Sequence, residues 1–377
     1  MTRRTKPEAQ PETITHLTSP LGRRARMDGL TGLRGMAALW VVAFHYDIGP
    51  FSPLHIGRAV PVIQLGYLGV DLFFILSGFV IWHVHAEDFR RPSLATFKRF
   101  VGLRLARLYP VYLFTLLLLL GMLMAAPYIG AFALDPRNFR LHQLLIDLAM
   151  LQTWGLVHHL GWNYPAWSIS AEWFCYLFFP LAAISLARFG RWRLIAALAA
   201  LLVALIGVYL VVFGETMNQT LGATALVRAL IEFLMGCLLR RIADVVPVER
   251  VCWTAPFLVL LALAVAVFEL GSPLASFMPV VLFPVLILAA STRANTIGRI
   301  AACRPLVMIG TASYSLYLMQ APVQKGTHVL SAIIARAHPL ACALAVLFYL
   351  ALLAAATILV HRFVEAPSRR FLRQRIA

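Results

Sequence analysis

Hydrophobic and polar positions along the chain are grouped into long segments rather than alternating residue by residue. Apolar runs of about 20 residues recur from one end of the sequence to the other, and a helix of this length crosses about 30 Å of hydrocarbon. The runs are continuously apolar, which favours helices over the strands of a membrane barrel. The pattern therefore predicts an all-α membrane protein.

Ten of these segments are predicted to span the bilayer. They start near Gly29, Gly66, Pro110, Ala166, Leu194, Thr220, Val251, Leu274, Leu306 and Pro339. An eleventh candidate, "LHQLLIDLAMLQTWGLV" at residues 141–157, is weaker because Gln143, Asp147 and Gln152 interrupt it. Loop charge decides its status, since Lys and Arg gather in the short loops on the cytoplasmic side.

The basic residues favour a topology in which residues 141–157 do not span. With the N-terminus inside, 26 of the 33 Lys and Arg residues then face the cytoplasm. We therefore expect about ten transmembrane helices, cytoplasmic N- and C-termini, and a long outer segment over 127–165 between spans three and four. The predicted organisation is a basic N-terminal tail over 1–27, a transmembrane domain over 28–362, and a basic C-terminal tail over 363–377.

Composition supports this class of protein. The chain of 377 residues is 61% hydrophobic and 13% charged, with a mean hydropathy of +0.80. The net charge of +17 could suggest nucleic acid, but in a membrane protein it is typical of loops that face anionic lipid. We therefore expect a lipid bilayer and no nucleic acid as partner. The five cysteines stand singly without metal-ligand spacing, which predicts packing roles and no metal site.

Ionisable residues inside a span cost roughly 2.5–3.5 kcal/mol each and are functional candidates by default. In "GLRGMAALWVVAFHYD", Arg34 and His45 are eleven residues apart. That spacing puts both on one helix face, about 16 Å apart along the axis, with Arg34 toward the cytoplasm. Alternatively, Arg34 extends to the inner interface and His45 rests at the outer one.

Two carboxylates are predicted to lie at about the depth of His45. Asp71 lies one turn inside the outer end of the second span, and Glu172 lies with Ser168 and Ser170 at the outer start of the fourth. Each carboxylate could equally be a first-turn acid that interacts favourably with the positive end of its own helix.

A basic segment, "FKRFVGLRLARLYP", precedes the third span. Within it, Arg104 and Arg107 lie three residues apart on one helix face and could hold a phosphate together. The alternative is ordinary anchoring on the cytoplasmic side. Arg228 and Glu232, one turn apart in the sixth span, are adequately explained by an internal salt bridge.

Together these residues place a histidine and two carboxylates near the outer face and arginines near the inner face. This arrangement suits an enzyme that takes a donor from the cytoplasm and an acceptor from outside. It would also suit a transporter, in which buried charges mark a translocation path.

Several segments resemble the membrane acyltransferase-3 family. They are "DGLTGLRGMAALWVVAFHYD", "LGVDLFFILSGFVI", "RLARLYPVY", "WSISAEWFCYLFFP" and "GTASYSLYLMQAPV". The resemblance spans nearly the whole chain in the family's order. It includes an Arg-x10-His signature at Arg34 and His45 and an Arg-x2-Arg signature at Arg104 and Arg107.

The resemblance implies a membrane O-acyltransferase of the bacterial inner membrane that acylates hydroxyls of exported or lipid-linked glycans. It implies His45 as the essential catalytic residue, assisted by Arg34, with Asp71 or Glu172 orienting the imidazole. The implied donor is acetyl-CoA or another acyl-CoA, with its phosphates held by Arg104 and Arg107.

In the last two segments the resemblance implies contacts with substrate, from Trp167, Ser168, Ser170, Tyr317 and Gln320. The family often has histidine where this chain has Gln320, so proton transfer is not expected there, although an amide can still bind substrate. We expect the stand-alone type of the family, without an appended hydrolase-like domain. The alternatives are a permease or flippase for a glycan, and an acyltransferase of the same fold directed at a peptide or lipid.

Overall fold

Helices make up the regular structure of the computed structural model, which describes residues 20–48, 56–129, 139–157, 161–208, 222–245, 255–270, 273–335 and 339–376. No strand occurs within these ranges. The α-helices are α2 (Pro20–Asp47), α3 (Leu68–His85), α4 (Leu94–Ile129), α5 (Leu141–Leu148), α6 (Trp167–Leu186), α7 (Arg191–Gly207), α8 (Ala223–Ile242), α9 (Ala255–Phe268), α10 (Pro273–Ala290), α11 (Thr296–Ala301), α12 (Arg304–Thr311), α13 (Ser313–Ala335), α14 (Pro339–Val360) and α15 (Ala366–Ile376).

Shorter turns join these helices. The 3₁₀ turns are η1 (Ile56–Arg58), η2 (Pro61–Leu65), η3 (Glu87–Arg90) and η5 (Tyr164–Ala166). A π-helical turn, η9 (His361–Glu365), lies between α14 and α15. A π-helical turn changes the direction in which the side chains of a helix project, and such turns are frequent at functional sites.

Each of the ten segments predicted from hydropathy coincides with a helix, which confirms the all-α prediction. Four stretches among the described residues are long and apolar enough to cross a membrane: Leu68–His85, Leu94–Tyr128, Tyr164–Leu186 and Ala343–Ile376. The weak segment at 141–157 holds only the eight-residue helix α5, too short to span. The count of ten spans and the orientation of the chain stay predictions.

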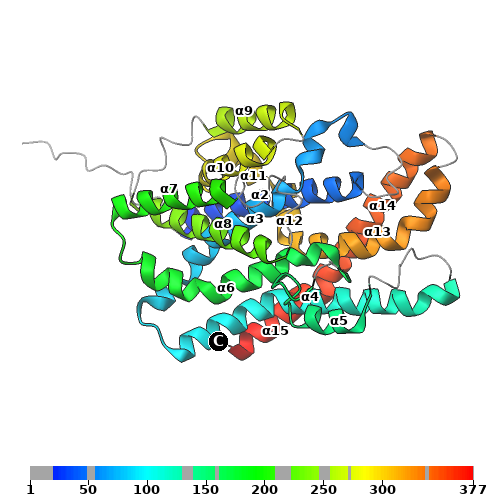
Figure 1. The fold of residues 1–377 in the computed structure, drawn as a ribbon, viewed down its shortest axis with the longest axis horizontal. Coiled ribbons are helices and arrows are strands. Elements are labelled where there is room, and N and C mark those ends of the chain that lie inside the picture. Colours follow the sequence, from blue (N-terminus) through cyan, green and yellow to red (C-terminus); the bar gives the residue numbers. More distant parts are fainter. Residues whose placement is uncertain are drawn as a thin grey trace, which may run out of the picture.

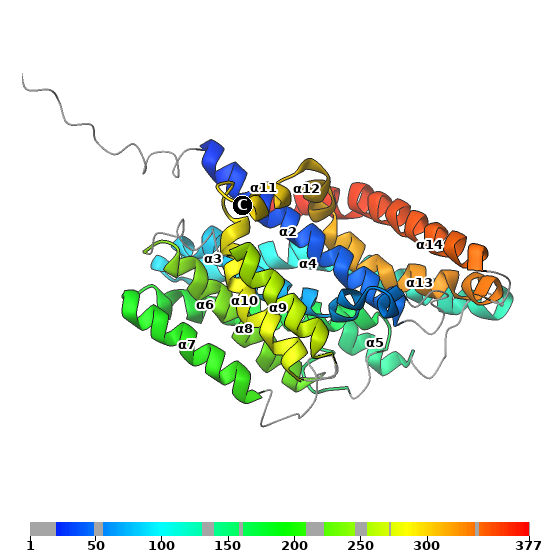
Figure 2. The same cartoon turned by 90° about the horizontal axis from the view of Figure 1, so that it is seen from above.

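Most of the long helices run along a common direction (Figure 1). The view from above shows α13 and α14 side by side at one edge and α7 at another (Figure 2). Helix α3 lies in the interior, packed against α2, α8 and α10. Helix α15, drawn in red, lies along the first part of α4 (Figure 1).

Helices α3 and α8 make a close crossing at two glycines. A Cβ atom added to Gly78 would lie 1.9 Å from the carbonyl oxygen of Phe233, and one added to Gly236 would lie 1.9 Å from that of Ile75. Since lipid provides no hydrophobic drive between helices, small residues that allow such backbone approach stabilise their packing. This crossing fixes α3, which carries Asp71 and Ser77.

The segment that contains α5 is held against α4 by hydrogen bonds to backbone carbonyls. The Tyr112 hydroxyl donates to the carbonyl of Asp147 at 2.6 Å, and the Tyr109 hydroxyl donates to that of Leu148 at 3.1 Å. The Gln152 amide donates to the carbonyl of Ala166 at 2.9 Å. These contacts position η5 and the start of α6.

The glycine crossing predicts a selective loss of folded protein. Replacing Gly236 with Leu should prevent α3 and α8 from approaching, so little monodisperse protein should be recovered in detergent. The matched control is Gly121→Leu, because nothing lies within 4 Å of a Cβ at Gly121. Equal yields and equal melting temperatures for the two variants, measured by size exclusion and thermal unfolding, would contradict the interpretation.

Asp147 predicts a pH dependence of stability. Burial raises the pKa of its carboxyl to about 7, and its Oδ1 atom has no hydrogen-bond partner in the described part of the chain. The folded state therefore favours the protonated acid, and stability falls as pH rises from about 4 to about 7. Asp147→Asn should flatten this fall and raise the melting temperature above pH 7.

The control for this experiment is Glu87→Gln. Glu87 is an exposed carboxylate that pairs with Arg90 on the surface, so its removal should leave the decline of melting temperature between pH 4 and 7 in place. A decline of the same size in Asp147→Asn would show that another group causes it.

Candidate active site

Helices α2 and α13 run side by side with matching spacing. Arg34 donates from Nη2 to Ser313 Oγ at 3.1 Å, and the Gln324 amide donates to the carbonyl of His45 at 3.1 Å. Each pair of positions is eleven residues apart on its helix, so the two helices are parallel. Tyr317 and Gln320 lie on the same face of α13 between these two contacts. Along the helix axis they therefore lie between Arg34 and His45.

A cavity of about 140 Å³ opens at the Arg34 end. One water needs roughly 10–15 Å³, so the cavity has room for several waters or for an extended chain. Its polar lining comes from α2, α3, α4, α6 and α13: Arg34, Ser77, Arg104, Arg107, Ser168, Glu172, Tyr176, Ser313, Tyr314 and Tyr317. Three arginines against one carboxylate make the lining positive, which suits an anionic ligand.

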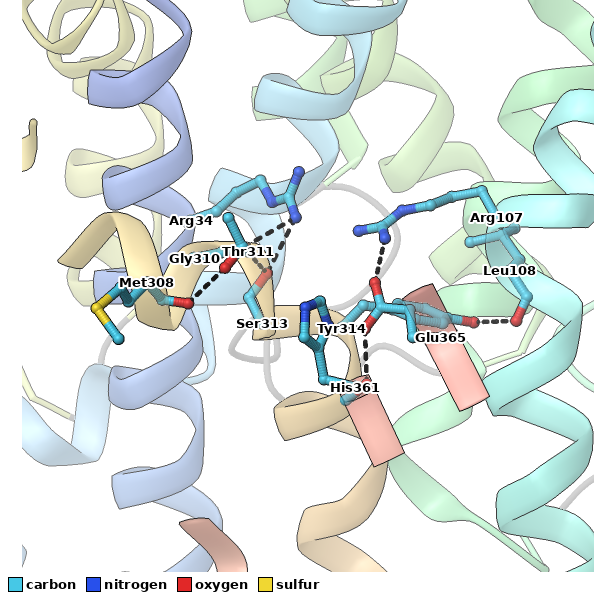
Figure 3. A network of polar contacts seen from close by, with 11 residues as sticks. Arg34, Arg107, Leu108, Met308, Gly310, Thr311, Ser313, Tyr314, His361 and Glu365 are labelled. Carbon is cyan, nitrogen blue, oxygen red and sulfur yellow. Dashed lines mark hydrogen bonds and ion pairs between the residues drawn. The ribbon is translucent and has the colours of Figure 1, made fainter. Parts of the chain in front are cut away.

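The guanidinium groups of Arg34 and Arg107 point into the same space from opposite sides (Figure 3). Arg34 also donates to the carbonyl of Gly310 at 3.1 Å. Arg107 forms an ion pair with Glu365 and lies over the ring of Tyr314. These contacts fix both cations while leaving donors for a ligand, because a guanidinium carries five N–H groups.

Glu365 is the buried counter-charge of this arrangement. Only 2% of its side chain is exposed. Besides the ion pair with Arg107, it accepts a hydrogen bond from Ser315 Oγ at 2.6 Å. It also accepts one from His361 Nδ1 at 2.9 Å (Figure 3). The π-helical turn η9 thus connects α15 to α4 and α13 through one carboxylate.

Arg104 is held by a second chain of contacts. Its Nη2 atom donates to His85 Nε2 at 3.1 Å, and His85 Nδ1 donates to the Asp88 carboxylate at 2.9 Å. Because a guanidinium only donates, His85 must carry its proton on Nδ1. Arg104 also lies over the rings of Phe100 and Tyr176. The side chain is therefore oriented before any ligand binds.

Glu172 faces the cavity rather than His45. Its Oε1 atom accepts hydrogen bonds from Tyr176 and from Ser77 Oγ, the latter at 2.8 Å. The charge of Glu172 acts on both Arg34 and Arg104, but no ion pair within 4 Å joins it to either. The carboxylate therefore offsets part of the positive charge without occupying the arginine donors.

His45 is oriented by the backbone of its own helix. Its Nδ1 atom lies 3.0 Å from the carbonyl oxygen of Val41, and a carbonyl only accepts, so Nδ1 carries the proton. Nε2 is then the basic nitrogen of the neutral ring, and no described residue forms a hydrogen bond with it. The ring packs against Phe44 and Tyr164.

Residues of η5 and α6 connect the surroundings of His45 to the cavity. Tyr164, which packs against His45, donates from its hydroxyl to Gln324 at 2.9 Å. The neighbouring carbonyl of Pro165 accepts from Tyr317 at 2.9 Å, and Ser168 Oγ lies 2.8 Å from the Tyr317 hydroxyl. Ser168 and Tyr317 are also part of the cavity wall.

Asp71 lies in a separate buried group of charges. Its carboxylate is 3.4 Å from Nε of Arg228 and is fully buried. Glu232, also fully buried, lies in the field of both residues, and Arg228 lies over the ring of Trp167. The ion pair predicted between Arg228 and Glu232 is formed instead between Arg228 and Asp71, and Glu232 contributes its charge to the same group. Asp71 therefore has Arg228 rather than His45 as its partner.

The remaining predicted substrate residues have different surroundings. Ser170 donates to the carbonyl of Met150 at 2.7 Å and accepts from the amide of Thr153, so it fastens the segment after α5. Gln320 is 1% exposed, and neither amide atom has a hydrogen-bond partner in the part of the chain that the structure describes. A buried unpaired amide calls for an explanation, and a bound substrate would provide one.

The sequence profile of the acyltransferase domain family matches residues 27–361. The chain belongs to the acyltransferase-3 family.

Two relatives extend this finding. The chain is 30% identical to the acyltransferase MdmB of Streptomyces mycarofaciens, over 94% of each protein. It is 23% identical to the O-acetyltransferase OatA of Staphylococcus aureus over 79% of its own length, which covers 50% of that relative. No solved structure matches the chain. The protein is therefore an acyltransferase, as the motifs predicted.

Several residues in and around the cavity were not predicted from the sequence. Ser77, Tyr176 and Tyr314 line it, while Glu365 and His85 hold Arg107 and Arg104. One feature of the sequence could have indicated Glu365, because it is the sole acidic residue in the basic segment 361–377. No group of side chains suited to a metal ion occurs among the described residues.

The buried ion pair predicts a large stability effect. Replacing Glu365 with Gln leaves Arg107 without its counter-charge, and loss of one partner of a buried pair costs about 3–5 kcal/mol. Thermal or denaturant unfolding in detergent should show a loss of unfolding free energy of about 3 kcal/mol, because the Gln amide oxygen can still accept a hydrogen bond. Ser315→Ala removes only a neutral donor to the same carboxylate and should cost about 1 kcal/mol. Equal effects for the two variants would contradict the role of Glu365.

Proposed function

We propose that this protein is a His45-dependent membrane O-acyltransferase of the bacterial inner membrane. It moves an acyl group, most simply acetyl, from cytosolic acyl-CoA to a hydroxyl of an exported or lipid-linked glycan. The observation that carries the proposal is the shared face of α2 and α13. A cavity lined by arginines lies at one end of this face, and a histidine with an available Nε2 lies at the other.

The donor end is assigned by charge. Arg104 and Arg107 lie three residues apart on α4 and both line the cavity, and Arg34 faces Arg107 across it (Figure 3). Arginine suits phosphate because its planar group gives two parallel hydrogen bonds. In the predicted orientation this end faces the cytoplasm, where acyl-CoA is found.

The chemical step needs one base and one acid. His45 Nε2 removes the proton of the acceptor hydroxyl as its oxygen attacks the thioester carbonyl. The carbon–sulfur bond breaks, the imidazolium returns the proton to the leaving thiolate, and the products are an ester and free CoA. The Val41 carbonyl keeps the ring in the required tautomer, the role that a carboxylate has in catalytic triads. In this proposal Asp71 supports the packing of α3 on α8 instead.

The acyl arm would follow the face of α13 from the cavity to His45. Arg34 and His45 are about 16 Å apart along α2, and Tyr317 and Gln320 lie between their levels on α13. The unpaired amide of Gln320 can donate to and accept from the amides of the pantetheine arm, and Trp167 and Ser168 complete the wall near α6. The proposal also includes the predicted organisation of the chain, with a transmembrane domain over 28–362 and cytoplasmic tails over 1–27 and 363–377.

The proposal predicts that His45→Ala abolishes acyl transfer. The acylated glycan should disappear from the envelope while the amount of membrane-inserted protein stays normal, because the side chain makes no long-range hydrogen bond. Mass spectrometry of the glycan from strains with wild-type or variant protein measures this. The matched control is His142→Ala, which removes an exposed imidazole from α5 and leaves His45 and its contacts in place.

Ester formation by His45→Ala at the wild-type level would refute the catalytic role. The same comparison with a deletion strain tests the reaction class. A deletion strain that exports normal amounts of glycan without ester groups supports the enzyme, whereas loss of the exported glycan itself would indicate a permease or flippase. An ester missing from a peptide or lipid would reassign the acceptor.

A further inference from the structure

The C-terminal helix α15 packs against the first part of α4 (Figure 1), the helix that carries Arg104 and Arg107 of the cavity wall. A Cβ atom added to Gly102 of α4 would lie 3.3 Å from the Ile376 side chain, so the end of α15 is close to α4. At the other end, Glu365 forms an ion pair with Arg107. Contacts at both ends therefore fix α15 on the basic turns of α4.

One face of α15 adds positive charge to this place. Glu365, Arg369 and Arg373 follow at intervals of four residues, so they lie on one helix face. Because Glu365 reaches Arg107, that face is turned toward α4. The charge of Arg369 interacts with Arg107, Arg373 and Arg104, and the charge of Arg373 acts on Arg104.

The result is a group of four arginines from two helices, Arg104 and Arg107 in the cavity wall and Arg369 and Arg373 at the exposed edge. We call it the arginine group. Among the described residues, the carboxylates that act most strongly on it are Glu365 and Glu172, and Asp88 lies behind His85, which accepts from Arg104. Each of the two glutamates already accepts hydrogen bonds, Glu365 from Ser315 and His361 and Glu172 from Ser77 and Tyr176. Like charges at this density repel one another unless an anion binds between them.

We propose that α15 completes the phosphate-binding site for the donor. Arg104 and Arg107 hold the diphosphate of acyl-CoA, and Arg369 and Arg373 hold the 3′-phosphate at its nucleotide end. The order follows from the ligand, because the diphosphate lies between the pantetheine arm and the adenosine. This inference rests on acyl-CoA being the donor, and it gives a binding role to a segment that lies beyond the family match.

Ligand binding by the purified protein in nanodiscs of neutral phosphatidylcholine tests the inference. The probes are CoA and 3′-dephospho-CoA, titrated calorimetrically. Wild-type protein should bind CoA more tightly than dephospho-CoA. The double variant Arg369→Gln/Arg373→Gln should weaken CoA binding about tenfold, equivalent to about 1.4 kcal/mol, and should bind the two probes almost equally.

The charge-matched control is Arg370→Gln/Arg375→Gln, which removes two exposed arginines from other faces of the same helix. It should keep the affinity for CoA and the preference for the 3′-phosphate. Arg369→Lys/Arg373→Lys should restore much of the preference, because it restores the charge. Arg104→Gln/Arg107→Gln should weaken the binding of both probes, since both contain the diphosphate.

Wild-type affinity and preference in Arg369→Gln/Arg373→Gln would overturn the inference. A second result would also overturn it. If the same double variant no longer binds vesicles of anionic phosphatidylglycerol but keeps its affinity for CoA, the arginines bind lipid headgroups instead. The proposed function fails separately. If wild-type protein binds CoA through α15 but transfers no acyl group, the phosphate site stands and the reaction is wrong.

Discussion

The Arg107–Glu365 ion pair is the interaction on which the rest of the site depends. Arg107 belongs to a cavity wall that contains two other guanidinium groups, and burying such a charge without a partner is costly. Glu365 provides that partner and also accepts hydrogen bonds from α13 and η9. The same contact that offsets the buried charge therefore holds α4, α13 and the C-terminal helix in fixed relation around the cavity.

The parallel arrangement of α2 and α13 fixes the levels of Arg34 and His45 against one face of α13. Ser313 and Gln324 contact the Arg34 and His45 levels of α2, so sliding of one helix along the other would break both contacts. Between these contacts Tyr317 lines the cavity, and the buried amide of Gln320 has no hydrogen-bond partner among the described residues. In the proposed function, an acyl arm bound at the arginine end follows this face, which lowers the entropy cost of reaching His45.

The sequence predicts the elements of this arrangement better than their pairing. Hydropathy located ten helices, and the eleven-residue spacing of Arg34 and His45 put them on one face. The partner of Asp71 could not be predicted, because it depends on the glycine crossing that brings α3 onto α8. His85 and Glu365 stand at the ends of apolar runs, where charged residues are common, and only tertiary packing shows that they hold Arg104 and Arg107. The orientation of the His45 ring depends on a backbone carbonyl, which no side-chain pattern reports.

Separation of the arginines from His45 has a physical reason of its own. A guanidinium beside an imidazole opposes protonation of the ring, because like charges repel strongly in a low dielectric. In the proposed function, a base that must accept a proton during acyl transfer is therefore better placed away from the cations proposed to bind the donor. About 16 Å of helix provides this distance, while Glu172 and Glu365 further weaken the positive field. Under the proposed function, the spacing of the Arg-x10-His signature is a compromise. It is short enough for one extended ligand to reach both residues, and long enough to keep the cations away from a basic His45.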